Sequence, residues 1–127
     1  MLEAPGEQLL AGVEELLKTH RPAASLLHGD LWGGNWLATG DGEPVIFDPA
    51  VYYGDREADL AMTQLFGGFG PRFYRAYTAA APVPRGAELR RELYNLYHVL
   101  NHANLFGGGY ARSALGTIQR LLAELRG

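Results

Sequence analysis

Apolar residues recur at the three- and four-residue spacing of amphipathic helices in five stretches of the chain. The predicted helices cover residues 7–21, 55–66, 71–80, 86–105 and 111–125. Pro22 ends the first of them, and runs of glycine follow the second and the fourth. Residues 1–6, which include Pro5 and Gly6, are predicted to be an irregular lead-in.

Short apolar runs between the first two predicted helices do not fit helical spacing. Strands are predicted at residues 26–27, 36–38 and 44–47. Gly40-Asp41-Gly42 provides a turn between the last two, and residues 49–54 are predicted to be a loop. The predicted fold class is therefore α+β and mostly α, with five helices and a small β-hairpin in a single domain over residues 1–127.

The ends of the predicted strands carry polar side chains that suit phosphoryl transfer. Asp30 closely follows the first strand, Asn35 lies in the next loop, and Asp48 ends the apolar run of residues 45–47. Strand ends hold polar groups still while leaving them exposed. A carboxylate that accepts a hydroxyl proton and two oxygen ligands for Mg²⁺ are the minimum set for this chemistry. We therefore predict Asp30 as the base and Asn35 and Asp48 as the metal ligands.

Each of these residues also has an ordinary structural explanation. Asp30 could form an Asx turn beside Gly29, and Asn35 could occupy a left-handed position after the preceding diglycine. A carboxylate at a strand end, such as Asp48, is a common feature of loops. The combination of all three at these spacings favours the functional interpretation.

Four other residues are candidates on weaker grounds. His28 is better explained as a structural residue that hydrogen-bonds loop backbone than as a ligand or base. Trp32 is either a core anchor or a face on which a substrate ring or cation stacks. His98 and Asn101 belong to a half-polar stripe of the longest helix. Spacing alone favours a partly exposed helix flank there, and the functional alternative is a wall of the substrate pocket.

Composition narrows the class of protein and the choice of partners. Hydrophobic residues make up 47% and charged residues 20% of the chain, as in a globular protein. The net charge of −3, without a basic stripe, argues against a nucleic-acid partner. No apolar run is long enough for a membrane span or resembles a signal peptide, and cysteine is absent, so the cytoplasm is the default expectation.

The sequence argues against two other kinds of functional site. A histidine-based metal site would need a companion acid at ligand spacing, which His28, His98 and His102 lack. A Ser-His-Asp hydrolase would need a G-x-S-x-G motif, which is absent, and Ser25 and Ser113 lie in ordinary settings.

The motifs around the candidate site resemble those of a known family. H-G-D-L-W-G-G-N matches the H-x-D-x-x-x-x-N catalytic loop of protein-kinase-like enzymes, in the form typical of the aminoglycoside and choline kinase branch. The finer pattern resembles the fructosamine kinase family. It comprises L-L-H-G-D-L-W-G-G-N from residue 26, V-I-F-D-P-A from 45, Y-G-D-R-E-A-D-L-A-M from 53, F-G-G-F from 66 and L-N-H-A-N-L-F-G-G-G-Y from 100.

This resemblance implies the C-terminal lobe of a protein-kinase-like fold that phosphorylates a ketosamine at the 3-hydroxyl of its sugar, using ATP and Mg²⁺. It makes Asp30 the base and Asn35 and Asp48 the magnesium ligands, and it makes Trp32 face the sugar. Asp59 would be a buried helix residue that ties the catalytic loop in place. The substrate is expected to be a small ketosamine or a glycated amine.

The chain departs from the family pattern in one respect. No glycine-rich loop precedes the catalytic segment, and the only lysine, Lys18, lies in the first predicted helix. We therefore expect a lobe without its ATP-clamping partner, either an excised fragment or a truncated product. Such a lobe should be inactive alone and should tend to form a homodimer through the uncovered lobe face. The alternative from another class is a non-catalytic helical interaction module.

Overall fold

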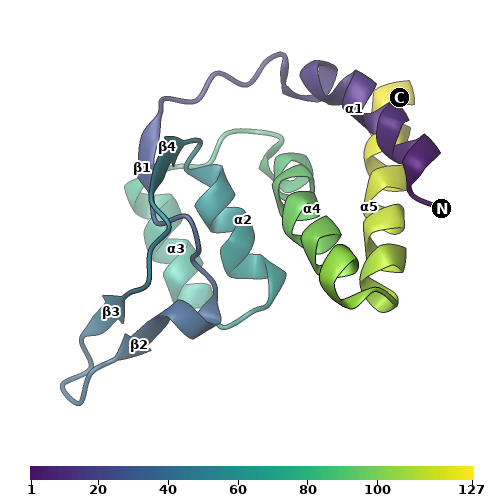
Figure 1. The fold of residues 1–127 in the computed structure, drawn as a ribbon. Coiled ribbons are helices and arrows are strands. Elements are labelled where there is room, and N and C mark those ends of the chain that lie inside the picture. Colours follow the sequence, from purple (N-terminus) through teal and green to yellow (C-terminus); the bar gives the residue numbers. More distant parts are fainter. The chain divides into compact units, whose positions relative to one another are not determined.

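The computed structural model describes residues 1–127, which form two compact units. One unit comprises residues 1–21 and 88–127, and the other comprises residues 22–87. Figure 1 labels the elements of both units in chain order. No helix of the structure is both long enough and apolar enough to span a bilayer.

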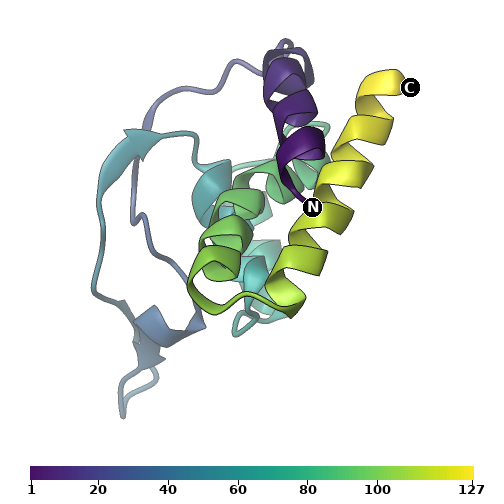
Figure 2. The same ribbon diagram turned by 45° about the vertical axis from the view of Figure 1, so that its right-hand side comes forward.

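The first unit is helical. It contains α1 (Glu3–Leu17), α4 (Ala87–Phe106) and α5 (Gly109–Arg126). Figure 2 shows α1 lying alongside α5, and a Cβ added at Gly12 of α1 would lie 2.3 Å from a methyl carbon of Leu125 of α5, which would have to move. The core of this unit is formed by apolar side chains from all three helices: Leu9, Leu96, Ala114, Ile118, Leu121 and Leu122.

The bounds of α1 differ from the prediction at both ends. The helix begins at Glu3, because Pro5 lies in the first turn, where a missing N–H costs no hydrogen bond. The Gly6 N–H donates to the Leu2 carbonyl at 2.8 Å, so the turn is complete. The helix ends at Leu17 rather than at residue 21, and the chain leaves it through three-residue turns: the Lys18 N–H donates to the Glu15 carbonyl at 3.5 Å and the His20 N–H to the Leu17 carbonyl at 3.0 Å. Pro22 disfavours helical dihedrals only at Arg21.

The second unit combines short strands with two helices. Its elements are β1 (Ser25–Leu27), the 3₁₀ turn η1 (Gly33–Asn35), β2 (Trp36–Ala38), β3 (Pro44–Ile46), β4 (Tyr52–Gly54), α2 (Glu57–Leu65) and α3 (Pro71–Ala80). The β2–β3 pair is antiparallel, with Trp36 opposite Ile46, which confirms the predicted hairpin. The five predicted helices are all present.

A second antiparallel pair joins β1 to β4. Ser25 lies opposite Gly54, and Leu27 lies opposite Tyr52. The prediction of a loop over residues 49–54 was therefore wrong for the last three of these residues. Three residues give too short a pattern to reveal a strand, and the pairing joins segments far apart in the sequence. It fixes both ends of the segment that carries the candidate site.

The helix α2 supplies most of the core beneath the strands. Ala61, Met62 and Thr63 are buried, together with Leu27 of β1. The Asp55 carboxylate accepts the N–H of Glu57 at 3.0 Å and so satisfies a free donor at the start of α2. Within the helix, the Thr63 hydroxyl donates to the Leu60 carbonyl at 2.6 Å. The helix is therefore anchored at its start and along its buried face.

Candidate functional site

Asp30 and Asn35 are in direct contact within the loop that follows β1. The side-chain nitrogen Nδ2 of Asn35 donates to the Asp30 carbonyl at 2.9 Å and to the Asp30 carboxylate oxygen Oδ2 at 3.1 Å. Asn35 is buried, with 6% of its surface exposed, and Asp30 is half-buried. Both bonds use the amide nitrogen, so the amide oxygen of Asn35, the atom able to bind a hard cation, lies outside this pair of bonds.

Asp48 lies in a short segment that is hydrogen-bonded, before and after Asp48, to the loop that follows β1. Before it, the Phe47 N–H donates to the Asn35 carbonyl at 3.0 Å. After it, the Ala50 N–H donates to the His28 carbonyl at 2.8 Å. Asp48 is exposed and is the one non-glycine residue of the chain with a positive φ, at 51°. Strained residues of this kind persist where their surroundings hold them and are concentrated at functional sites.

The His28 ring connects these two segments through backbone groups. Nε2 donates to the Phe47 carbonyl at 2.8 Å, and Nδ1 accepts the Asp30 N–H at 3.2 Å. A carbonyl can only accept and an amide can only donate, so the two partners fix one neutral tautomer. Because both nitrogens are used, the geometry favours the structural interpretation of His28 over a ligand or base.

Asp59 holds the start of the loop from α2. Its Oδ2 accepts the His28 N–H at 2.8 Å, and its Oδ1 accepts the Gly29 N–H at 3.0 Å. These are the backbone bonds predicted from the sequence, although the side chain is half-buried rather than buried. A carboxylate that accepts two amide donors is a strong anchor, because bonds to a charged acceptor are stronger than neutral ones.

Trp32 lies over its own loop instead of entering the core. Its ring covers Gly34 so closely that an added Cβ there would lie 2.1 Å from the ring. The side chain is 41% exposed. Of the two alternatives left open by the sequence, this exposure favours a stacking face over a core anchor.

The 3₁₀ turn η1 also contacts the loop after α2, where two diglycine pairs, Gly33-Gly34 and Gly67-Gly68, meet. The backbone of Gly33 meets that of Gly67 and Gly68, and a Cβ on Gly68 would lie 2.8 Å from the Gly33 Cα. The Trp36 indole N–H donates to the Gly68 carbonyl at 3.0 Å. Sequence reasoning missed this contact, although both diglycines stand in its motifs. Two diglycines near one site are a usable signal, since glycine permits close backbone approach.

We predict that Trp36→Phe lowers the free energy of unfolding by about 1 kcal/mol, the usual net value of one hydrogen bond. The ring would keep its packing on Phe69, whose centroid lies 5.8 Å away, but would lose the donor to Gly68. Urea unfolding followed by circular dichroism measures the change. Trp32→Phe is the matched control. An equal loss in both variants would argue against a stabilising role of the hydrogen bond between Trp36 and Gly68.

Tyr52 is the titratable group whose pKa the site shifts. Partial burial raises the pKa of its hydroxyl, and the carboxylates of Asp59 and Asp55 raise it further. The negative charge of Asp59 is therefore felt at β4 as well as at the loop. The hydroxyl remains protonated throughout the neutral pH range.

His98 and Asn101 lie on α4, in the helical unit. Asn101 is exposed and His98 is half-buried. The His98 carbonyl interacts with the ring nitrogen Nδ1 of His102 at 2.8 Å. The assignment of His98 and Asn101 to a substrate pocket stays a prediction.

Comparisons with known proteins identify the class to which this fold and site belong. A crystal structure from Thermobifida fusca, of a protein provisionally called a fructosamine-3-kinase, superposes with a TM-score of 0.79 and 38% identity. The matched region covers 94% of this chain and 41% of the Thermobifida fusca chain. The fold is thus that of a kinase-like C-terminal lobe, α+β and mostly α.

The sequence comparisons place the chain more narrowly. The family model described as fructosamine kinase matches residues 2–124, so the chain belongs to the fructosamine kinase family. A probable ketoamine kinase of Vibrio parahaemolyticus is 54% identical over 111 residues, which is 87% of this chain. A chloroplastic protein-ribulosamine 3-kinase of Oryza sativa subsp. indica is 47% identical over 121 residues, which is 95% of this chain. The chain spans only 38% and 35% of the lengths of these two relatives.

Proposed function

We propose that this chain carries the catalytic residues of an ATP-dependent kinase that phosphorylates ketosamines at the 3-hydroxyl of the sugar. The observation that carries the proposal is the Asp30–Asn35 contact, at 3.1 Å, in a loop joined by backbone hydrogen bonds to the strained Asp48 segment. Membership of the family supports a sugar-amine kinase, and the names of the relatives supply the ketosamine class of substrate.

Asp30 would act as the general base. It would accept the proton of the sugar 3-hydroxyl as the hydroxyl oxygen bonds to the γ-phosphorus of ATP and the bond to ADP breaks. The contact from Asn35 holds the carboxylate in one orientation, and the bonds from the Gly29 and His28 N–H groups to Asp59 fix the backbone before it. Phosphoryl transfer depends mainly on such positioning.

The residues present fit a magnesium ion. The amide oxygen of Asn35 and the exposed carboxylate of Asp48 are hard oxygen donors, and Mg²⁺ takes only one or two protein oxygens beside water and substrate phosphates. When bound, the ion would neutralise charge on the phosphates. The chain's own contribution is to hold the two donors, since the Phe47 N–H bond to the Asn35 carbonyl joins their segments at 3.0 Å.

Trp32 is proposed to face the sugar, since its ring is exposed beside Asp30 in the sequence. His98 and Asn101 are proposed to contact substrate from α4. The chain covers about two fifths of its relatives, so we propose that its turnover alone is negligible and that the complete phosphate clamp needs further residues.

Magnesium-dependent binding of nucleotide tests the proposal in this chain without requiring turnover. We predict that ATP with Mg²⁺ raises Tm and that ATP or Mg²⁺ alone does not. At about ten times the dissociation constant, binding adds about 1.4 kcal/mol, which raises Tm by roughly 3–10 °C. Asp48→Asn should remove the shift, and Asp41→Asn, in the exposed hairpin turn, should keep it. A shift that survives Asp48→Asn would contradict the proposed site.

A further inference from the structure

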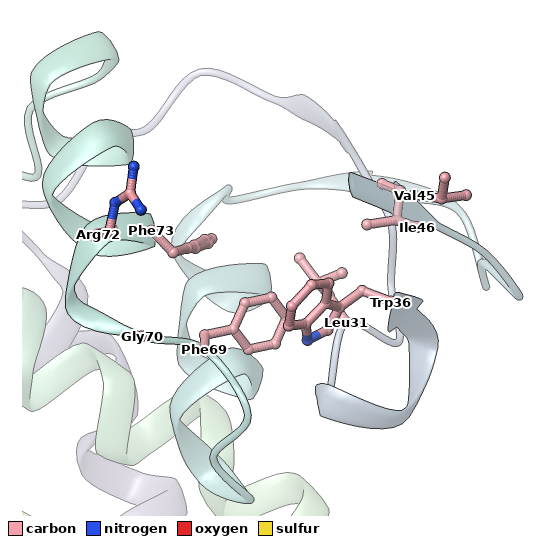
Figure 3. Close-up of a pocket in the computed structure, with 8 residues that line it drawn as sticks. All are labelled: Leu31, Trp36, Val45, Ile46, Phe69, Gly70, Arg72 and Phe73. Carbon is pink, nitrogen blue, oxygen red and sulfur yellow. The ribbon is translucent and has the colours of Figure 1, made fainter. Parts of the chain in front are cut away.

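A second feature of the strand-containing unit is an apolar pocket of about 380 Å³. Figure 3 shows Arg72 and Phe73 of α3 on one side of it and Val45 and Ile46 of the hairpin on the other. Phe69, Trp36 and Leu31 complete the lining side chains. The volume lies at the lower end of the range for small-molecule sites, which suits one side-chain-sized group.

The pocket is lined by aromatic rings and by one positively charged side chain, that of Arg72. Phe69 lies 5.8 Å from the Trp36 ring and 4.8 Å from the Phe73 ring, measured between centroids, so the three rings form a continuous apolar surface. Ile46 is 60% exposed on the opposite wall. Arg72 is exposed and forms no ion pair within the chain. An apolar pocket with one charged group at its edge is complementary to an apolar ligand that carries an anion.

The pocket is next to the candidate catalytic residues along the chain. Leu31 follows Asp30, Trp36 follows Asn35, and Ile46 precedes Asp48 by two residues. Consecutive Cα atoms lie about 3.8 Å apart. The residues that line the pocket and the candidate catalytic residues therefore belong to the same short segments of backbone.

We propose that this pocket binds the amine-side portion of the ketosamine, and that it selects sugar adducts of apolar α-amino acids. The apolar side chain would occupy the aromatic wall, and the α-carboxylate would pair with Arg72. This proposal rests on the proposed function, because it assigns the pocket to the substrate of the Asp30 site.

The charge at the pocket edge is what distinguishes this occupant. A purely apolar occupant, from a second copy of the chain or from a longer protein, would gain from the aromatic wall but would form no ion pair with the exposed Arg72. An amino-acid adduct satisfies both parts of the pocket with one small group. Its sugar also accounts for the adjacency to Asp30.

Isothermal titration of the 127-residue chain with three synthetic adducts tests the proposal. The probes are fructosyl-phenylalanine, fructosyl-glycine, which lacks the ring, and fructosyl-phenethylamine, which lacks the carboxylate. Fructosyl-phenylalanine should bind about 10-fold more tightly than the glycine adduct, since a partly buried aromatic ring is worth at least that much. It should bind about three- to tenfold more tightly than the phenethylamine adduct, from one exposed charge-assisted contact.

Two pairs of variants assign these differences to the pocket. Arg72→Gln should remove the advantage of the carboxylate, and Arg75→Gln, one turn further along α3 and outside the pocket, should keep it. Ile46→Ser should weaken fructosyl-phenylalanine about three- to tenfold, and Val51→Ser, equally exposed and outside the pocket, should not. All four positions are exposed, so the variants should fold.

The outcomes separate this proposal from the proposed function. Equal affinity for the three adducts, or equal effects of Arg72→Gln and Arg75→Gln, would overturn the pocket proposal and leave the kinase site untouched. Protection of the pocket by dimerisation, seen as ligand affinity that falls with protein concentration, would overturn it in favour of a second copy. Selective adduct binding without any magnesium-dependent nucleotide binding would support the pocket and count against the kinase.

Discussion

Replacing Asp30 with asparagine is expected to lower kcat by about two to four orders of magnitude, the usual contribution of a general base. The affinity for nucleotide should change by less than about threefold, because the base acts on the acceptor hydroxyl rather than on ATP. The fold of the loop should survive. The amide oxygen of the replacement can still accept the bond that Asn35 donates at 3.1 Å.

The measurement uses a chimera, because this chain spans only 38% of the length of the Vibrio parahaemolyticus relative. The chimera joins the N-terminal part of that relative to this chain, and its activity before substitution is the reference. Asp41→Asn removes the same charge from the exposed hairpin turn and should leave kcat unchanged. A parallel fall in kcat and in nucleotide affinity for Asp30→Asn would instead make Asp30 a structural residue.

Local patterns were sufficient to predict most of the elements. The β2–β3 hairpin followed from one strong turn signal between two apolar runs, and the helices followed from their spacing. What escaped prediction depends on distant parts of the chain. The strand β4 exists through its pairing with β1, and Tyr52 and Tyr53 are exposed enough that no apolar alternation marks them.

In the candidate site too, some features could be predicted from the sequence and others depend on how the chain packs. Motif spacing brought together Asp30 and Asn35. The bonds to Asp59 were anticipated from the family resemblance, and they agree with the need of a carboxylate in a packed helix for donors. The left-handed backbone of Asp48 left no trace in the sequence, since its side chain does not report its dihedral angles. The pocket is likewise a product of packing, because it is lined by four separate segments of the chain.

The closest backbone approach in the site is predicted to make Gly29→Ala strongly destabilising. Gly29 has a φ of 89°, and an added Cβ would lie 1.9 Å from the Ala50 carbonyl oxygen. The left-handed conformation alone costs about 1–2 kcal/mol for a residue with a Cβ. The backbone must also separate, which breaks the Ala50–His28 hydrogen bond, worth about 1 kcal/mol. We therefore expect a loss of about 2–4 kcal/mol in the free energy of unfolding.

Comparison with Gly42→Ala separates the cost of crowding at Gly29 from the conformational cost of a positive φ. Gly42 has a similar φ of 80°, but nothing lies within 4 Å of its added Cβ, so only the conformational cost of about 1–2 kcal/mol should remain. Urea unfolding compares the two variants, and hydrogen exchange at the Ala50 amide reports the broken bond directly. Equal losses in both variants, with the Ala50 amide still protected from exchange, would mean that the added Cβ at Gly29 is accommodated without separating the loop from the Asp48 segment. If the contact between Gly29 and Ala50 positions Asp48, Gly29→Ala should also abolish the magnesium-dependent rise in Tm with ATP, and Gly42→Ala should retain it.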